Sequence, residues 1–301
     1  MSQPEMRLRI YGARGSYAST SGKASSIGVN TTCLRVDIGK NILIFDAGSG
    51  IIPLGNDLIQ ELKQERGEEA RWKVHLLFTH MHIDHLVGFP YFSMLYVPRA
   101  IIHFIGPRIL DYDLKEVLHA FVHPPFFPVS LDDLPFEGHF HQIAERNVIY
   151  FYEDGFHIAT ILDAPPEGWQ ARISCMRNYL HPKGGTFFYR IETRAGRKVV
   201  FASDTEGFIG GDQRLIEFAR NADLLFHDAQ YVPSEYQMFQ GFGHSTYEMA
   251  CEIAQKAGVQ KLLLFHHDPN HDDAALKEIE QKAQKLFPRA FVASESMQFE
   301  F

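Results

Sequence analysis

Residues 79–85 read Thr-His-Met-His-Ile-Asp-His, and they place four metal-binding side chains within six positions: His80, His82, Asp84 and His85. They follow the apolar run 74–78, which is typical of a buried strand, so the turn at its end can direct alternate side chains into one cleft. Imidazole and carboxylate are ligands of Zn, Fe and Mn, and mixing them over so short a spacing suits two ions better than one. A histidine-rich, solvent-exposed turn is the competing interpretation.

The composition is that of a folded enzyme-sized protein. The chain has 301 residues, of which 45% are hydrophobic and 13% aromatic, so it can bury a large core in one domain or in two small ones. No repeat or low-complexity linker marks a boundary, and we expect a single domain over residues 1–301. Cys33, Cys175 and Cys251 lie far apart without Cys-x-x-Cys spacing, which argues against a disulfide framework and against a thiolate metal site.

The expected compartment is the cytoplasm. The N-terminal residues lack an apolar signal core, no run of 18 apolar residues occurs, and the cysteine usage fits a reducing environment, so we expect no membrane contact. The formal net charge is −8, from 29 basic and 37 acidic residues, and no Lys/Arg cluster exceeds two residues. The sequence therefore shows no dedicated polyanion-binding surface, and a long nucleic acid substrate is disfavoured.

The apolar pattern predicts an α+β fold with two mixed sheets sandwiched between helices. Alternation in 6–10 and 34–38 predicts an antiparallel meander, and a strand at 41–45 runs through an Asp-Ala-Gly-Ser-Gly turn into a helix at 51–63. Further strands are expected at 100–105, 148–152, 156–162, 172–179, 186–192, 199–202, 224–226 and 262–265, and further helices at 110–122, 214–220, 246–257 and 274–286.

The segment 122–140 stands apart because it is rich in Pro and Phe, a composition that resists regular structure. We interpret it as an insertion near the cleft mouth or as a subunit contact. Covering a sheet edge is the alternative role.

Three later apolar strands also end in residues that bind metals. The strand at 172–179 leads to His181, the strand at 199–202 to Asp204, and the strand at 262–265 to His266 and His267. Singly, such residues commonly accept or donate hydrogen bonds at turns. Together with the first motif they supply seven ligands, which is what two divalent ions with a bridging carboxylate require. Because the last strand is buried on both faces, alternation cannot choose between His266 and His267.

These motifs resemble the metallo-β-lactamase superfamily, and more closely its phosphodiesterase branch, which includes ribonuclease Z and small cyclic-phosphate phosphodiesterases. The resemblance covers nearly the whole chain and implies a four-layer αββα sandwich forming one metallo-hydrolase domain. It also implies that the ligand in the last strand is the first histidine after it, His266. The ligands so implied are His80, His82 and His181 for the first metal, Asp84, His85 and His266 for the second, and Asp204 as the bridge. Two Zn²⁺ ions are expected, with Mn²⁺ and Fe²⁺ as alternatives.

Outside the ligands, the segment 241–248 reads Gly-Phe-Gly-His-Ser-Thr-Tyr-Glu. Ser245 and Glu248 have the spacing of a capping box, so a helix start is the simpler interpretation. In ribonuclease Z-like enzymes a histidine in such an element protonates the leaving oxygen, and we assign this role to His244, since imidazole titrates near neutral pH.

The resemblance suggests roles for four further residues. Asp228 is expected to orient a histidine, with a plain strand-end acceptor as the alternative. Tyr231 is expected to contact the substrate, and Asp46 to be structural. Arg14 could hold a substrate phosphate or pair with a surface acid. With His244 and Asp228, we count Asp84 among the catalytic residues.

The implied reaction is in-line attack of a metal-bridging hydroxide on a phosphodiester, with His244 protonating the departing oxygen. Because the chain is acidic and lacks a glycine-rich or basic arm, we expect a small cyclic phosphodiester, foremost a 3′,5′-cyclic nucleotide. The alternatives are a ribonuclease Z-like tRNA 3′-processing endonuclease, a lactonase or thioesterase of the same fold, and a metal-dependent sensor without turnover. Related proteins are often dimers, so a homodimer is expected.

Overall fold

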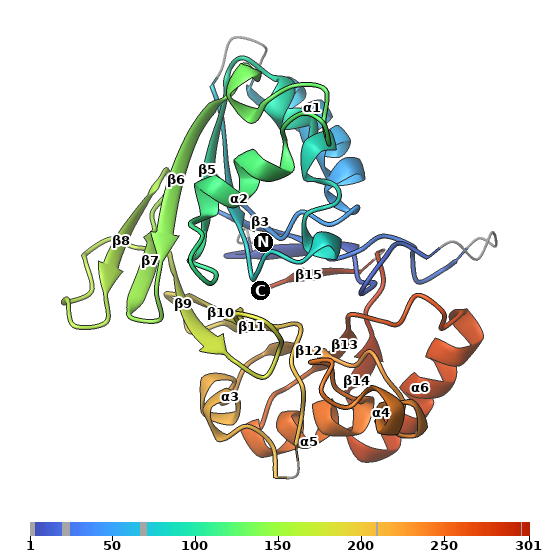
Figure 1. Cartoon of the computed structure of the whole chain (residues 1–301). Coiled ribbons are helices and arrows are strands. Elements are labelled where there is room, and N and C mark those ends of the chain that lie inside the picture. Colours follow the sequence, from blue (N-terminus) through green and yellow to red (C-terminus); the bar gives the residue numbers. More distant parts are fainter. Residues whose placement is uncertain (1–3, 20–24, 67–70, 209, 296) are drawn as a thin grey trace.

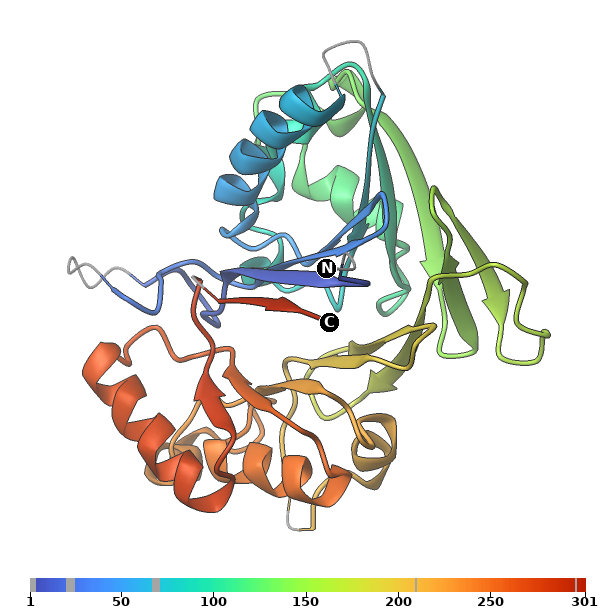
Figure 2. The same ribbon diagram turned by 180° about the vertical axis from the view of Figure 1, so that it is seen from behind.

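The computed structural model describes residues 4–19, 25–66, 71–208, 210–295 and 297–301. Two mixed β-sheets lie face to face, and helices cover the outer face of each, as Figures 1 and 2 show from opposite sides. This arrangement confirms the predicted αββα sandwich with two mixed sheets.

The first sheet holds the N-terminal strands and the end of the chain. Its antiparallel part is the predicted meander β1 to β3, and β3 to β6 run parallel. The C-terminal strand pairs with β1, which brings the two ends of the chain close together (Figure 1). In spatial order its strands are β15 (Gln298–Glu300), β1 (Arg7–Gly12), β2 (Cys33–Ile38), β3 (Asn41–Phe45), β4 (Trp72–Leu77), β5 (Ala100–Pro107) and β6 (Glu137–Ile143).

The second sheet positions half of the predicted site. Its strands β11 to β14 are parallel, so the carboxyl ends of β11, β12 and β13 meet at one edge. β11 ends two residues before Asp204, β12 ends at Asp228, and β13 ends directly before His266. In spatial order its strands are β14 (Ala290–Val292), β13 (Leu262–Phe265), β12 (Leu224–Asp228), β11 (Lys198–Ala202), β10 (Thr186–Thr193), β9 (Ala171–Asn178), β7 (Asn147–Phe151) and β8 (Phe156–Thr160).

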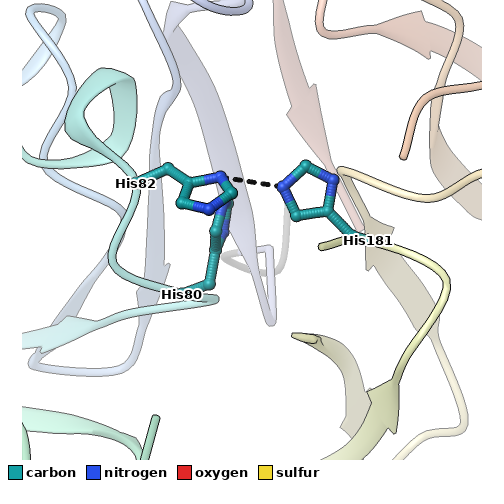
Figure 3. A group of neighbouring side chains, drawn as sticks. All are labelled: His80, His82 and His181. Atoms are coloured by element: carbon teal, nitrogen blue, oxygen red, sulfur yellow. Dashed lines mark hydrogen bonds between the residues drawn. The ribbon is translucent and has the colours of Figure 1, made fainter. Parts of the chain in front are cut away.

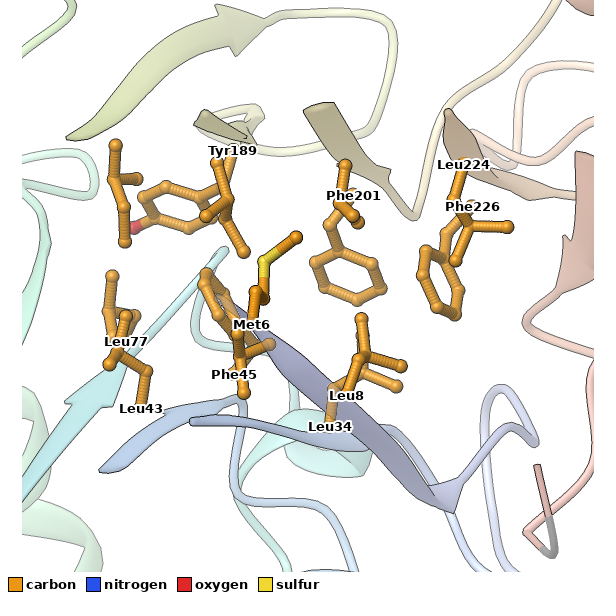
Figure 4. Packing of buried hydrophobic residues seen from close by; sticks show 14 of the residues in the cluster. Met6, Leu8, Leu34, Leu43, Phe45, Leu77, Tyr189, Phe201, Leu224 and Phe226 are labelled. Atoms are coloured by element: carbon orange, nitrogen blue, oxygen red, sulfur yellow. The ribbon is translucent and has the colours of Figure 1, made fainter. Parts of the chain in front are cut away.

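Apolar burial holds the layers together. Side chains from both sheets, including Phe45, Tyr189 and Phe201, form the central core between them (Figure 4). Separate clusters pack under α1 (Ile51–Arg66) and α2 (Leu114–Phe121) on the first sheet, and under α3 (Gln213–Phe218), α5 (Tyr247–Ala257) and α6 (Asp273–Leu286) on the second. Single-turn 3₁₀ helices occur at η1 (Ile83–His85), η2 (Phe89–Tyr91), η3 (Ser93–Tyr96) and η4 (Leu131–Asp133).

Several boundaries differ from expectation for local reasons. The helix expected at 110–122 begins at Leu114, because Asp113 caps it by accepting a hydrogen bond from Glu116 N. In the segment 122–140, regular structure returns at η4 and at β6, whose first residue is Glu137. The short elements α4 (Pro233–Phe239), β14 and β15 were not predicted.

The cap of α5 is one residue later than the expected Ser245. Thr246 is the N-cap and its hydroxyl accepts from Met249 N. The Ser245 hydroxyl instead donates to the carbonyl of Thr205 at 2.6 Å. The Ser245–Glu248 capping box predicted from the sequence is therefore wrong.

Candidate metal centre

The turn after β4 is held by a buried carboxylate at the end of the neighbouring strand β3. Asp46 accepts hydrogen bonds from the backbone N of Thr79, from the Thr79 hydroxyl and from His85 Nδ1, each at 2.8 Å. The bond to Nδ1 turns His85 Nε2 toward the other predicted ligands, which are within a few ångströms of it. Asp46 thus orients a ligand, in line with the structural role expected for it.

The first group of predicted ligands joins the turn after β4 to the loop after β9. The ligand atoms of His80, His82 and His181 lie within 4.8 Å of one another. His82 Nδ1 and His181 Nε2 are 2.8 Å apart, the contact drawn in Figure 3. His181 Nδ1 donates to the carbonyl of Gly243 at 2.9 Å, which leaves its Nε2 facing the group.

The second group is fully buried and lies beside the first. The ligand atoms of Asp84, His85, Asp204 and His266 lie within 4.8 Å of one another. Asp204 occupies the middle: its oxygens are 3.3 Å from His85 Nε2 and 3.2 Å from His266 Nε2. The same carboxylate is 3.7 Å from His80 Nε2 and 3.8 Å from His181 Nε2 in the first group. A carboxylate between two sets of imidazoles is the arrangement that a bridging ligand needs.

The donor set fits two divalent cations. His80 Nε2 is buried and has no hydrogen-bond partner among the described residues, while its Nδ1 contacts the Thr79 hydroxyl at 3.0 Å. A buried, unpaired imidazole nitrogen is costly unless it binds a partner such as a metal. Nitrogen and oxygen donors converging on a buried point match the ligand preferences of Zn²⁺, Mn²⁺ and Fe²⁺.

The electrostatics favour ligation over protonation in the first group. Burial lowers the pKa of His80 well below its ordinary value, and burial together with His181 lowers the pKa of His82 to about 4. These imidazoles are therefore neutral near pH 7, which is the form that binds metals.

In the second group the carboxylates favour positive charge. Burial alone would lower the pKa of His85, yet the neighbouring Asp204, Asp84 and Asp46 outweigh it and raise that pKa well above its ordinary value. The position of His85 among three carboxylates therefore attracts a cation, which is what a metal supplies.

The structure distinguishes the two histidines that end β13. His266 Nε2 lies 3.1 Å from Asp84 Oδ2, and its Nδ1 lies 3.0 Å from Gln230 Oε1. His267 Nε2 instead donates to the carbonyl of Ala293 at 3.0 Å, away from the ligand groups. The geometry therefore supports His266, the first histidine after the strand, as the ligand.

Three residues of the site adopt left-handed backbone conformations within two residues of a strand end. Their φ angles are 61° at Asp46, 57° at Asp204 and 61° at His266. Non-glycine residues rarely adopt such angles, and the cost is tolerated mainly where the conformation serves a function. Here the turned backbone lets a residue at a strand end direct its side chain across the edge of the sheet.

His244 lies beside both ligand groups and is held by Asp228. His244 Nδ1 is 2.7 Å from Asp228 Oδ2. The His244 ring stacks on His266, with centroids 4.8 Å apart, and lies 5.0 Å from the His181 ring. Burial lowers the pKa of His244, but the Asp228 carboxylate outweighs this effect and the net result is a pKa of about 9. His244 is therefore placed to carry a proton at neutral pH.

The two predicted substrate contacts, Tyr231 and Arg14, are both buried. Tyr231 lies next to His244, with centroids 6.0 Å apart, but its ring is buried and stacks on Phe239 at 5.1 Å. The face available for a substrate base is thus already covered. Arg14 is also buried, and its guanidinium donates to the carbonyls of Gly28, Asp268 and His271 at 3.0, 3.2 and 2.7 Å. Three of its five N–H groups are used within the protein and the residue is 2% exposed, which favours a structural role over the two expected ones.

Several contacts that position the site were not predicted from the sequence. Gln230 positions His266, the backbone N of Ser16 donates to Asp84 Oδ2 at 2.8 Å, and the carbonyl of Gly243 fixes His181. Backbone groups leave no trace in a sequence. Gln230 follows Asp228 by two residues, which was the one signal available for it.

The chain is similar to known proteins over most of its length. Residues 40–267 match the family described as the Beta-lactamase superfamily domain. Ribonuclease Z of Pyrococcus horikoshii is 26% identical over 289 residues, covering 87% of this chain and 88% of that protein. Ribonuclease Z of Archaeoglobus fulgidus is 26% identical over 320 residues, covering 94% and 96% of the two chains.

Solved structures share the fold. The metallo-β-lactamase fold protein YhfI from Bacillus subtilis superposes with a TM-score of 0.63 at 18% identity, covering 98% of this chain and 99% of the other. The short form of human tRNase Z superposes with a TM-score of 0.61 at 18% identity, covering 98% of each chain. On the matched domain, the sandwich and the relatives spanning most of the sequence, this chain belongs to the metallo-β-lactamase superfamily, in its ribonuclease Z-like branch, and is a metal-dependent hydrolase.

Proposed function

We propose that the whole chain forms one dinuclear phosphodiesterase domain that hydrolyses a small cyclic phosphodiester, foremost a 3′,5′-cyclic nucleotide. The observation that carries this proposal is the position of Asp204 between the two ligand groups, within 3.8 Å of a nitrogen in each. Two ions sharing one carboxylate hold a phosphodiester in the geometry of an in-line displacement.

Each residue of the proposed site has one role. His80, His82 and His181 would hold one ion, Asp84, His85 and His266 the other, and Asp204 would bridge them. Zn²⁺ is the proposed ion, with Mn²⁺ and Fe²⁺ as alternatives. When bound, the ions supply a water activated at neutral pH and positive charge beside the phosphoryl oxygens. His244, protonated and oriented by Asp228, gives its proton to the leaving oxygen.

The preference for a small substrate is supported by the charges near the site. Arg14 donates to carbonyls, and Arg177, near His181, donates to the carbonyls of Gly184 and Arg108 at 2.9 and 2.7 Å. Next to the site, Phe242 is an exposed aromatic ring, at 59%, and Lys183, two residues after His181, is an exposed cation. One ring and one cation suit a single nucleotide better than a run of phosphates, which is bound by several Lys and Arg side chains.

The second candidate is tRNA 3′ processing. It is favoured by the relatives named ribonuclease Z, which align over most of this chain. It would use the same ligands and the same proton donor on a larger substrate.

The deciding experiment is product analysis after incubation with 3′,5′- and 2′,3′-cyclic nucleotides, cyclic dinucleotides and a tRNA precursor. Asp204→Ala removes the proposed bridge, and Asp132→Ala, at an exposed carboxylate on the surface, is the matched control. We expect cyclic mononucleotide cleavage that only Asp204→Ala abolishes. Cleavage of the precursor alone, with strong salt dependence, would move the assignment to RNA processing.

We further propose a homodimer that pairs through an apolar groove beside the turn at 79–85. The groove has a volume of about 560 Å³ and is lined without any charged residue by Ile83, Val87, Pro90, Tyr91, Val117, Ala120, Phe121, Phe126 and Phe127. Phe126 is 85% exposed, which is costly for a large aromatic ring on a monomer. Phe126 and Phe127 belong to the segment 122–140, and this supports the subunit-contact interpretation of it.

The dimer is tested by light scattering after size exclusion. We expect Phe126→Glu to give monomers and Leu162→Glu, at a 91% exposed position in the loop after β8, to leave the mass unchanged. A wild-type monomer would refute the dimer.

The cytoplasm remains the proposed compartment, supported by three buried cysteines with free thiols. Among the described residues, no helix has both the length and the apolarity needed to cross a membrane.

A further inference from the structure

A histidine cluster lies in the first sheet outside the metal centre, and we propose that it binds one further divalent transition ion, of the Zn²⁺ class. The cluster consists of His75, His103, His139 and His141. Five residues of extended chain, about 16 Å, separate His75 from His80. The cluster belongs to neither ligand group of the metal centre.

The sheet register brings these four residues together. In the parallel strands β4, β5 and β6, His75 is opposite His103, and His103 is opposite His139. His141 follows two residues later on β6, so all four side chains share one face. The rings stack, with centroids 5.1 Å apart between His75 and His103 and 5.0 Å apart between His103 and His139.

Two nitrogens of the cluster already have the separation of ligands of one ion. His103 Nδ1 and His141 Nε2 are 3.1 Å apart. In tetrahedral zinc sites with bonds of about 2.0 to 2.1 Å, two nitrogen ligands lie about 3.3 Å from each other. This pair can supply two ligands to one ion. In this structure the ligand atoms of three cluster residues do not yet converge, so a rotation of the partly exposed His139, or water, completes the coordination.

His75 supplies an independent observation. Its side chain is fully buried, and neither ring nitrogen has a hydrogen-bond partner among the residues that the structure describes. Its ring lies against His103 and the apolar Phe151 and Phe156. A buried imidazole with both nitrogens unpaired is unfavourable unless something in the cluster binds it, and a metal ion does so directly.

The surroundings keep the cluster ready to bind and accessible. Burial lowers the pKa of His75 to about 3 and that of His103 to about 4, so both rings are neutral at physiological pH. Phe156 closes the inner side, with its centroid 5.0 to 5.2 Å from those of three of the rings. On the open side, His139 sits on the edge strand β6 with 43% of its side chain exposed, so an ion can enter there.

The test is zinc content per chain. The full-length protein is stripped of metal, saturated with Zn²⁺, desalted and measured by elemental mass spectrometry for wild type, His103→Ala and His141→Gln. His157→Gln, at an exposed histidine on the neighbouring strand β8, is the matched control. We expect wild type and the control to hold one more zinc per chain than either cluster variant, with unchanged phosphodiester hydrolysis.

Equal zinc content in all four proteins would overturn the proposal. Should His103→Ala fail to fold by circular dichroism, the partly exposed His141 gives the same comparison through His141→Gln. Because the measurement is a difference between variants, it depends neither on the activity nor on how many ions the metal centre holds.

Discussion

Asp228 Oδ2 lies 2.7 Å from His244 Nδ1 and joins the end of β12 to the segment that leads into α5. The carboxylate is fully buried and also accepts hydrogen bonds from the backbone N of Ser245 at 3.1 Å and of Thr205 at 3.2 Å. The backbone N of Gln230 also donates to it at 3.1 Å, so four donors fix this carboxylate, which in turn orients the His244 ring through Nδ1. An imidazole held in this way stays protonated until a more basic oxygen, such as a leaving alkoxide, accepts its proton.

The loss in kcat on removing the proton donor His244 should be larger for a more basic leaving group. For His244→Ala we expect kcat on an alkyl phosphodiester to fall about 10²- to 10⁴-fold. On a nitrophenyl diester, whose leaving oxygen needs no proton, the loss should be at most a few-fold. Steady-state rates on both substrates decide this. Equal losses would show that His244 acts on binding or folding and not as an acid.

The pH dependence should report the Asp228 carboxylate. Burial lowers the pKa of His244, but the Asp228 carboxylate has the larger effect and the resulting pKa is about 9. Because protonated His244 is the acid, kcat should decline as the pH rises through this value. In Asp228→Asn the charge is lost while burial remains, and we expect the alkaline limb to move down by about one pH unit or more. The readout is kcat against pH for both proteins. If the alkaline limb stays at the same pH in Asp228→Asn, a group other than His244 causes it.

Asp46 should control metal affinity without binding metal. It fixes His85 Nδ1 and the Thr79 backbone, so Asp46→Ala should weaken ion binding about 10- to 100-fold. Competition with a chromogenic chelator measures this. Asp37→Ala, at a carboxylate on β2 that pairs with Arg35, is the control and should leave the affinity unchanged.

Arg14 should affect stability and not substrate affinity. Its guanidinium ties three carbonyls together around the loop after His266, so Arg14→Met should lower the free energy of unfolding by about 3 kcal/mol. KM should change by less than about twofold, since the guanidinium is buried and bonded to backbone carbonyls. Arg197→Met, which breaks a surface ion pair between the exposed Arg197 and the largely buried Asp223, should cost less than about 1 kcal/mol. Urea unfolding and steady-state kinetics separate the two outcomes. A large rise in KM with unchanged stability would restore the phosphate-binding role.

His75 should make the fold sensitive to acid. Burial lowers its pKa in the folded protein to about 3, so the unfolded chain binds more protons and stability is lost as pH falls below the ordinary value of 6.5 toward 3. By this linkage, His75 should lower the free energy of unfolding at pH 5 by about 2 kcal/mol relative to neutral pH. In His75→Phe this loss should disappear. Urea unfolding of both proteins at pH 7 and pH 5, in chelator, tests it, and parallel losses would contradict it.

The sequence alone determined the elements whose signals are local. The meander, the strand ends that carry His80, His181, Asp204 and His266, and the alternation of layers all follow from apolar periodicity and short spacing. Short elements such as α4 and β15 were not predicted, because their stability comes from tertiary contacts and not from the apolar periodicity of their own residues.

The tertiary structure alone decided how side chains with the same signal are used. His266 and His267 are neighbours directly after a strand buried on both faces, and only the packing directs one toward Asp204 and the other toward Ala293. Arg14 was chemically suited to a phosphate, but the fold buries it and uses three of its five N–H groups on backbone carbonyls. The His75 cluster arises only when the register of three parallel strands aligns it. Spacing along a chain specifies which groups are near each other locally, whereas partners distant in sequence are set by the register and the packing of whole sheets.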